Sequence, residues 1–266
     1  MIRTQALGPR RFGPVNWLGL YSLTRREARR GMSDYNYQLF GPIVSALLYL
    51  AVFHLAARTA SAGAPGGLID FIAPGLIIYT ACEKAYEGAC GSFIFDKHER
   101  IIADLLMSPL NAVERMIGYV AGTTLNGLAV GLAVALVSLF FVTFDLAQPW
   151  ALLCFALMGT AMHSLVGILV GIWAEKWDQF AAIQTFILIP LSFLSGLFYQ
   201  VGALPEFAQA IVRWNPIFYV IDGFRFGLTG QAAADPLLGA LIVGAVDLAL
   251  GAWVYLWFRR GYKLKP

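Results

Sequence analysis

Three charged residues lie together inside a long apolar stretch of the chain. Glu83 and Glu87 are one helical turn apart, and Lys84 is spaced to pair with Glu87. A charge at bilayer depth costs about 2.5–3.5 kcal/mol on insertion scales, so it usually faces a cavity, a partner or the membrane interface. Counted from Leu68, Glu83 lies about 22 Å along a helix. Two interpretations stay open: a polar pathway or subunit interface, or a helix end that has already reached solvent.

The stretch Phe93–Met107 that follows is predicted to form a short amphipathic helix. Its apolar residues recur at helical spacing and form one edge: Ile101, Ile102, Leu105 and Leu106. Its polar residues are Asp96, Lys97, Glu99, Arg100 and Asp104. Ser108-Pro109 ends the helix, and Asn111 with Glu114 is a capping box for the next one. Such a helix packs either on its own membrane domain or in a groove of a partner.

A third candidate site is an apolar stretch, Phe207–Leu228, that is interrupted at Asn215-Pro216. Pro216 lacks a backbone donor and moves Asn215 away from helical geometry. The stretch also contains Arg213, Asp222 and Arg225. We therefore predict two short helices that dip into the membrane and return, serving either as a gate or as a packed plug. Asp247, further on, is a lone acid with no partner nearby in the sequence.

Several kinds of chemistry have no motif in this chain. No lysine follows a glycine, which excludes a GxxxxGK[ST] phosphate loop, and no GxSxG is present. His98-Glu99 begins like HExxH, but Ile102 stands where the second histidine would be. None of the 3 cysteines forms a CxxC pair. We expect no catalytic residue, no metal site and no cofactor on the chain itself.

The composition indicates the class of protein whose helices must position these residues. Of the 266 residues, 59% are apolar and only 13% are charged, against about 25% in soluble domains. This excludes a soluble enzyme and a nucleic-acid binder, and it predicts an all-α membrane protein. Six stretches are long enough to span a bilayer: Leu39–Ala57, 68–89, Met116–Phe144, Trp150–Ala174, Phe180–Phe198 and Leu237–Phe258. Glycine pairs four residues apart favour close helix packing, more within one chain than between chains.

The basic residues predict the orientation of the spans. With both termini in the cytoplasm, 15 of the 19 Lys and Arg residues lie on the cytoplasmic side. Trp17–Arg30 is amphipathic, with an aromatic and apolar face opposite its arginines, and is predicted to lie in the headgroup plane. The expected organisation is a cytosolic N-terminus with this interfacial helix (1–38), a six-helix membrane domain (39–258) and a basic cytosolic tail (259–266).

The order of these parts resembles that of the type-2 ATP-binding-cassette permeases, the membrane subunits of many bacterial exporters. The matching stretches are FIAPGL at Phe71–Leu76, DKHERIIADLLMSP at Asp96–Pro109 and NPIFYVIDGFRFGL at Asn215–Leu228. The resemblance covers essentially the whole chain and is nearest to the subgroup of multidrug and lipo-oligosaccharide or polysaccharide exporters. Charged Glu83, Lys84 and Glu87 depart from the neutral polar residues expected there.

The resemblance implies a bacterial inner-membrane exporter for an amphipathic substrate such as a lipid, a glycolipid or a drug. Two permease chains would form the pathway, and two separate ATPase subunits would bind ATP and Mg. The stretch from Asp96 to Met107, including Leu105, would be the coupling helix, and Asn215, Pro216, Tyr219 and Arg225 would belong to an outer gate. A secondary transporter is the alternative, but it would favour broken helices in both halves, and only one broken segment is seen.

Overall fold

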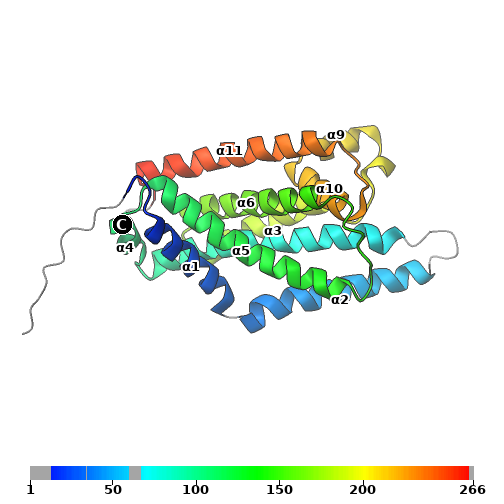
Figure 1. Ribbon diagram of the computed structural model, residues 1–266, viewed down its shortest axis with the longest axis horizontal. Coiled ribbons are helices and arrows are strands. Elements are labelled where there is room, and N and C mark those ends of the chain that lie inside the picture. The colour runs from blue at the N-terminus through cyan, green and yellow to red at the C-terminus, as the bar shows by residue number, and fades with distance from the viewer. Residues whose placement is uncertain (1–12, 34, 60–66, 264–266) are drawn as a thin grey trace, which may run out of the picture.

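The computed structural model describes residues 13–33, 35–59 and 67–263, and every regular element within them is helical. Most of the long helices run along the longest axis of the molecule (Figure 1). The long helices are α1 (Trp17–Ser33), α2 (Tyr35–Thr59), α3 (Gly67–His98), α5 (Ala112–Ser138), α6 (Pro149–Trp173) and α11 (Pro236–Arg260). The shorter elements are α4 (Ile102–Met107), α7 (Trp177–Ile183), the π-helical turn η1 (Gln184–Leu188), α8 (Ile189–Leu194), the 3-10 turn η2 (Val201–Ala203), α9 (Glu206–Trp214) and α10 (Pro216–Thr229).

Apolar helices of membrane-spanning length are present. Within the described residues, 4 helical stretches are long and apolar enough to cross a bilayer: α5, α6, α11 and the continuous stretch Trp177–Leu194 formed by α7, η1 and α8. The first predicted span lies in α2, whose apolar part is the shorter Leu39–Leu55. The second lies in α3, which also carries the charged residues described below.

Helix α3 is central to the bundle, because α5 and α6 pack closely against it at glycines. A Cβ atom on Gly127 would lie 2.4 Å from the carbonyl oxygen of Ala81, and one on Gly167 would lie 2.6 Å from that of Tyr86. Gly118 and Gly122 instead face Leu23 and Glu27 of α1. These contacts confirm that the spaced glycines serve packing within the chain.

Three predicted helix boundaries differ from the structure, one of them the end of the fifth span, predicted at Phe198 and found at Leu194. The helix expected over Phe93–Met107 is divided: α3 continues to His98, Arg100 has a positive φ of 58°, and only Ile102–Met107 forms α4. The third span was predicted to reach Phe144, but α5 ends at Ser138, whose carbonyl accepts the turn bonds of Phe141 and Val142. The apolar composition continues past Ser138 although the helix does not, and hydropathy alone does not mark where a helix ends.

Two local predictions are confirmed. Asn111 and Glu114 form the capping box of α5, with Glu114 N–H donating to Asn111 Oδ1 at 2.8 Å and Asn111 N–H to Glu114 Oε2 at 2.8 Å. The apolar stretch Phe207–Leu228 is broken into α9 and α10 at Asn215-Pro216. Four of the basic residues used for the orientation lie outside the described residues: Arg3, Arg10, Arg11 and Lys265.

Candidate functional site

The charged residues of α3 form a polar cluster with η1. Lys84 Nζ lies 2.5 Å from Glu87 Oε2, as their spacing predicts. Gln184 of η1 donates from Nε2 to Glu83 Oε1 at 3.1 Å and to Glu87 Oε1 at 2.8 Å. The Tyr79 hydroxyl donates to Glu83 Oε1 at 3.2 Å. We call Tyr79, Glu83, Lys84, Glu87 and Gln184 the mid-helix cluster.

The mid-helix cluster lies at the side of the bundle and is half-buried. Glu83, Lys84 and Glu87 all retain solvent-accessible surface in the isolated chain. The neighbouring stretch Trp177–Leu194 has few buried residues, and its Phe186 is 78% exposed. The described part of the chain therefore leaves uncovered the face formed by the mid-helix cluster and the stretch Trp177–Leu194 beside α3. The stretch includes the π-helical turn η1, and such turns often occur at functional sites.

Helix α4 uses its apolar edge within the chain. Ile102 and Leu105 are buried and pack in one cluster with Leu23, Phe93 and Tyr119. Of the two alternatives that the sequence left open, these two residues follow the first, packing on the chain's own membrane domain. Other residues are exposed on the outward face of α4 and on the turn before it: Glu99, Arg100, Ala103, Asp104 and Met107. Met107 is 77% exposed. Ile101 is half-buried between the two faces.

Asp96 is fully buried at the end of α3 and does not lie on the rim of α4, where the sequence had placed it. Its carboxylate accepts hydrogen bonds from Arg26 Nη2 at 2.8 Å, Arg30 Nη2 at 2.8 Å and the Tyr119 hydroxyl at 2.9 Å. Glu27 is also buried and adds an ion pair with Arg26 at 2.7 Å. This Asp96 network joins α1, α3 and α5.

The network corrects the expected orientation of α1. Arg26 and Arg30 face the protein, whereas Arg25 and Arg29 are exposed. Trp17 and Tyr21 are exposed on another part of the helix and remain available to a bilayer surface. The arginines are thus divided between the face of α1 that packs on the protein and the face that is exposed. Two of them pack inward because buried Asp96 and Glu27 carboxylates would be costly without a cation to neutralise them.

Lys97 binds the end of α6. Its Nζ donates to the carbonyl oxygens of Gly171 at 2.9 Å and Ala174 at 3.0 Å, and also to that of Ile172. The last carbonyls of a helix lack partners within it and carry a partial negative charge, which a lysine stabilises. Lys97 therefore fixes the α6 terminus and is not a free rim residue.

The residues assigned to the outer gate are held by the chain itself. Asn215 caps α10 and donates from Nδ2 to the Leu191 carbonyl and to Ser195 Oγ, both at 2.7 Å. Pro216 is the first residue of α10, where its missing N–H is not needed. The Tyr219 hydroxyl donates to the Arg213 carbonyl at 3.0 Å.

Arg225 is the most constrained residue of this group. It donates from Nε to the Phe71 carbonyl at 3.1 Å and from Nη2 to the Gly196 carbonyl at 3.0 Å, and its guanidinium lies 3.7 Å from the centre of the Phe71 ring. Asp222 lies 3.8 Å away and accepts the N–H groups of Ala233 and Ala234. These contacts join α10 to α3 and to the loop after α8.

Some important residues were not identified from the sequence. Tyr119 was missed because its partners Arg26 and Asp96 are far away along the chain. Glu27 was missed although its ion-pair partners are its neighbours Arg26 and Arg30, and a glutamate among four arginines was a signal. Gln184 was missed as well, and its amide inside an apolar stretch was the available signal.

A surface ion pair joins the segment after α6 to the segment after α11. Lys263 donates to Glu175 Oε1 at 3.0 Å, and this hydrogen bond and the charge of Lys263 lower the pKa of the exposed Glu175 carboxyl.

Long apolar helices around a charged central helix define a polytopic membrane protein, and comparison with known families identifies the kind. The family model described as "ABC-2 type transporter" matches residues 19–229. The chain belongs to this family, which confirms the resemblance seen in its motifs. It is a membrane subunit of a transporter, and the family implies a partner ATPase.

The chain is similar over nearly its full length to named permeases. It is 34% identical over 251 residues to the inner membrane transport permease YadH of Escherichia coli K12, covering 93% of this chain and 98% of that protein. It is 28% identical over 237 residues to nodulation protein J of Rhizobium leguminosarum bv. viciae, covering 85% and 87% respectively. The family does not favour the alternative of an ion-driven secondary transporter.

Proposed function

We propose that this chain is the permease of an ATP-driven exporter that moves an amphipathic substrate out of the cytoplasm or the inner leaflet. Two copies of the permease would form the pathway, with two ATPase subunits holding ATP and Mg. The chain would lie in a bacterial inner membrane with six spans: α2, α3, α5, α6, the stretch Trp177–Leu194, and α11. The segments α9 and α10 would form a re-entrant hairpin at the outer side.

The observation that supports this proposal most strongly is the construction of α4. The helix is 6 residues long, packs its apolar edge on its own bundle and directs a mixed polar and apolar face outward. Lys97 and Asp96 fix the end of α3 immediately before it. A rigidly mounted helix with an unoccupied outer face can transmit a movement of a bound partner to the spans. We assign the outer face, with Glu99, Arg100 and Asp104, to contact with the ATPase.

The mid-helix cluster is proposed to line the pathway or the interface between two permease copies. Its carboxylates are only half-buried within one chain, and the apolar stretch beside them is largely uncovered. Charged groups at bilayer depth normally face a cavity or a partner. A second copy of the permease placed against α3 and η1 would give the carboxylates a partner and would also cover the exposed apolar stretch.

Reversing the charges at Glu99 and Arg100 tests the function. Both side chains are exposed, so Glu99→Arg with Arg100→Glu preserves net charge and leaves the buried face of α4 intact. We expect normal insertion and thermal stability, about tenfold or greater weakening of the permease–ATPase complex, and loss of substrate-stimulated ATP hydrolysis. Co-purification from membranes and ATPase assays of the reconstituted complex measure these effects.

The matched control reverses an exposed pair at the opposite end, Glu206→Arg with Arg213→Glu on α9. This variant should keep the permease–ATPase complex. If the Glu99/Arg100 reversal leaves ATPase binding and stimulated hydrolysis unchanged, α4 is only a packing element. A cysteine at Asp104 that never cross-links to the ATPase in the active complex would lead to the same conclusion.

A further inference from the structure

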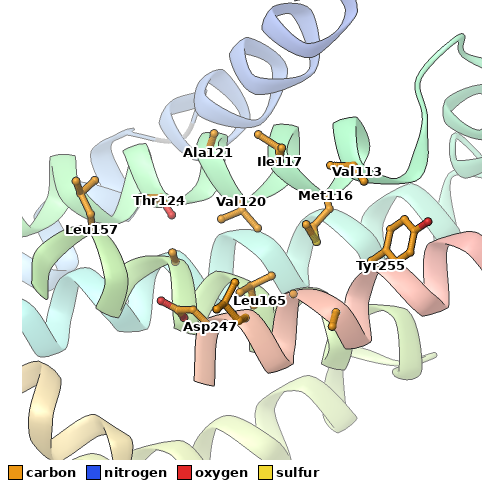
Figure 2. A pocket seen from close by; sticks show the side chains of 14 residues that line it. Val113, Met116, Ile117, Val120, Ala121, Thr124, Leu157, Leu165, Asp247 and Tyr255 are labelled. Carbon is orange, nitrogen blue, oxygen red and sulfur yellow. The ribbon is translucent and has the colours of Figure 1, made fainter. Parts of the chain in front are cut away.

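A groove between α5, α6 and α11 contains a carboxylate that no other group in the described chain satisfies. The cavity has a volume of about 510 Å³, within the range of about 300–1,000 Å³ typical of small-molecule sites. Figure 2 shows Asp247 and Tyr255 of α11 toward opposite ends of this groove, with Met116 and Val120 of α5 between them. Apart from Thr124, Asp247 and Tyr255, the lining is apolar.

Asp247 occupies the middle of its helix. It lies about 17 Å from the first residue of α11 and about 20 Å from the last, at 1.5 Å per residue. Its Oδ1 atom is buried and has no hydrogen-bond partner within the part of the chain described by the structure. A lone carboxylate at this depth is costly to insert and usually marks a pathway or a ligand.

The surrounding helices supply no cation. From α5 and α6 the groove receives aliphatic side chains, Met116 and the Thr124 hydroxyl, and α3 contributes the nearby buried thiol of Cys82. Between Arg115 near the start of α5 and Arg259 at the end of α11, these three groove helices carry no Lys or Arg. A cation that pairs with ionised Asp247 would therefore come from outside these three helices.

The chemistry of the groove distinguishes among possible cations. Ca²⁺ needs 6 or more oxygen ligands, Mg²⁺ an octahedral shell and Zn²⁺ at least three protein ligands, and one carboxylate among apolar side chains provides none of these. A second copy of the chain is a poor source as well, because its membrane-depth lysine, Lys84, is paired with Glu87. An organic ammonium group that carries a hydrocarbon body fits both the charge and the apolar walls.

We propose that the groove binds an amphipathic amine, with Asp247 as the counter-ion of its ammonium group and α5, α6 and α11 enclosing its hydrocarbon part. Exposed Val113 and Ile117 border the groove, so such a molecule can enter sideways from the bilayer. This inference rests on the proposed export function, since it names the chemical class of the substrate. Anionic and uncharged amphiphiles would leave the carboxylate unpaired.

Binding can be measured without ATP on the permease–ATPase complex in a non-ionic detergent. The probe is dodecyltrimethylammonium below its own micelle-forming concentration, and dodecanol is the uncharged match. A ligand that binds only the folded protein raises its Tm with concentration. We expect the cation to raise the Tm of the wild type and dodecanol to raise it much less. In Asp247→Asn the apparent affinity for the cation should fall by about tenfold or more.

Three further variants make the test selective. Asp247→Glu should retain binding of the cation, and Asp178→Asn, at an exposed acid on α7 outside the groove, should behave as the wild type. Ala252→Phe fills the groove from an exposed position and should abolish binding while Asp247 is intact. If Asp247→Asn does not fold, the Ala252→Phe variant still tests whether the cation binds in this groove.

The proposal is overturned if dodecanol and the cation bind equally, or if Asp247→Asn or Ala252→Phe binds the cation as the wild type does. Because no step requires ATP, its failure is separate from failure of the proposed export function. That function would be contradicted by a permease that does not change ATP hydrolysis, whatever the groove binds.

Discussion

Two clusters of charged side chains lie on the same helix, α3, and they are built in opposite ways. The Asp96 network is closed: its carboxylates are buried, and two arginines, a tyrosine and a serine from α1, α3 and α5 satisfy them. The mid-helix cluster is open: its carboxylates keep exposed surface and are held by only one short element, η1, beside α3. We therefore call the Asp96 network a structural joint, because it holds three helices together. The mid-helix cluster instead has a side that the described part of the chain leaves uncovered.

The position of each cluster agrees with this division. Asp96 lies at the end of α3, next to α4 and to the terminus of α6 that Lys97 binds, where rigid attachment is useful. Glu83 lies 13 residues earlier, about 20 Å along the helix, within the range predicted to cross the bilayer. A closed network there would leave no polar surface for a substrate or a second permease copy.

The largest expected effect is that of opening the closed network with Asp96→Asn. The variant removes the carboxylate charge that Arg26 and Arg30 share and leaves them with Glu27 as their remaining anion, and breaking one partner of a buried pair costs about 3–5 kcal/mol. We expect a marked fall in the yield of folded permease and in its Tm in detergent. Asp104→Asn, at an exposed acid only eight residues away, should change stability by no more than about 0.5 kcal/mol. Equal stability of the two variants would mean that the Asp96 network is not a joint.

An intermediate effect is expected in the open cluster, and on function more than on stability. The double variant Glu83→Gln/Glu87→Gln keeps the shape of both side chains and removes only charge. Pairs with exposed surface contribute about 0–1 kcal/mol, so the chain should fold and bind its ATPase normally. Transport, or assembly of the permease dimer, should decrease, as measured in proteoliposomes and by cross-linking. Unchanged transport and dimerisation would return these carboxylates to the interpretation of a solvated helix end.

The sequence predicted the features that depend on neighbouring residues. The capping box of Asn111 and Glu114 and the break at Asn215-Pro216 both follow from backbone chemistry between residues at most three positions apart, and both are present. The pairing of Lys84 with Glu87 is equally local. The six apolar stretches lie mostly within helices, although the third and fifth run past the helix ends at Ser138 and Leu194. Within the described residues, 4 helical stretches are long and apolar enough to cross a bilayer, because spanning length and composition are properties of a window rather than of a partner.

The sequence could not supply contacts that join distant segments. Asp96 looked like a surface residue of an amphipathic helix because Arg26 and Arg30, its partners, lie 70 and 66 positions away. Gln184 is 97 positions from Glu87, and Lys97 is 74 from Gly171. The apolar edge of α4 was visible in the sequence, but which body it packs against was not, since periodicity defines a face and not its partner.

The smallest expected effect belongs to a pair on the surface, Glu175 with Lys263, which tests whether exposed charges near the Asp96 end contribute as the buried ones do. Lys263 lowers the pKa of Glu175, so the pair stabilises the fold above the ordinary glutamic acid pKa of about 4.3 and its contribution is lost as the pH falls. The side chains are substantially exposed, and solvent screens their attraction. We therefore expect Glu175→Gln to have nearly the wild-type Tm at pH 7, and the small difference to vanish as the pH falls below the lowered pKa of Glu175. Thermal unfolding of both proteins across this range measures it. A large, salt-insensitive loss at pH 7 would show instead that this surface pair holds the C-terminal end of α11 against α6, and the distinction between buried joint and exposed pair would then fail.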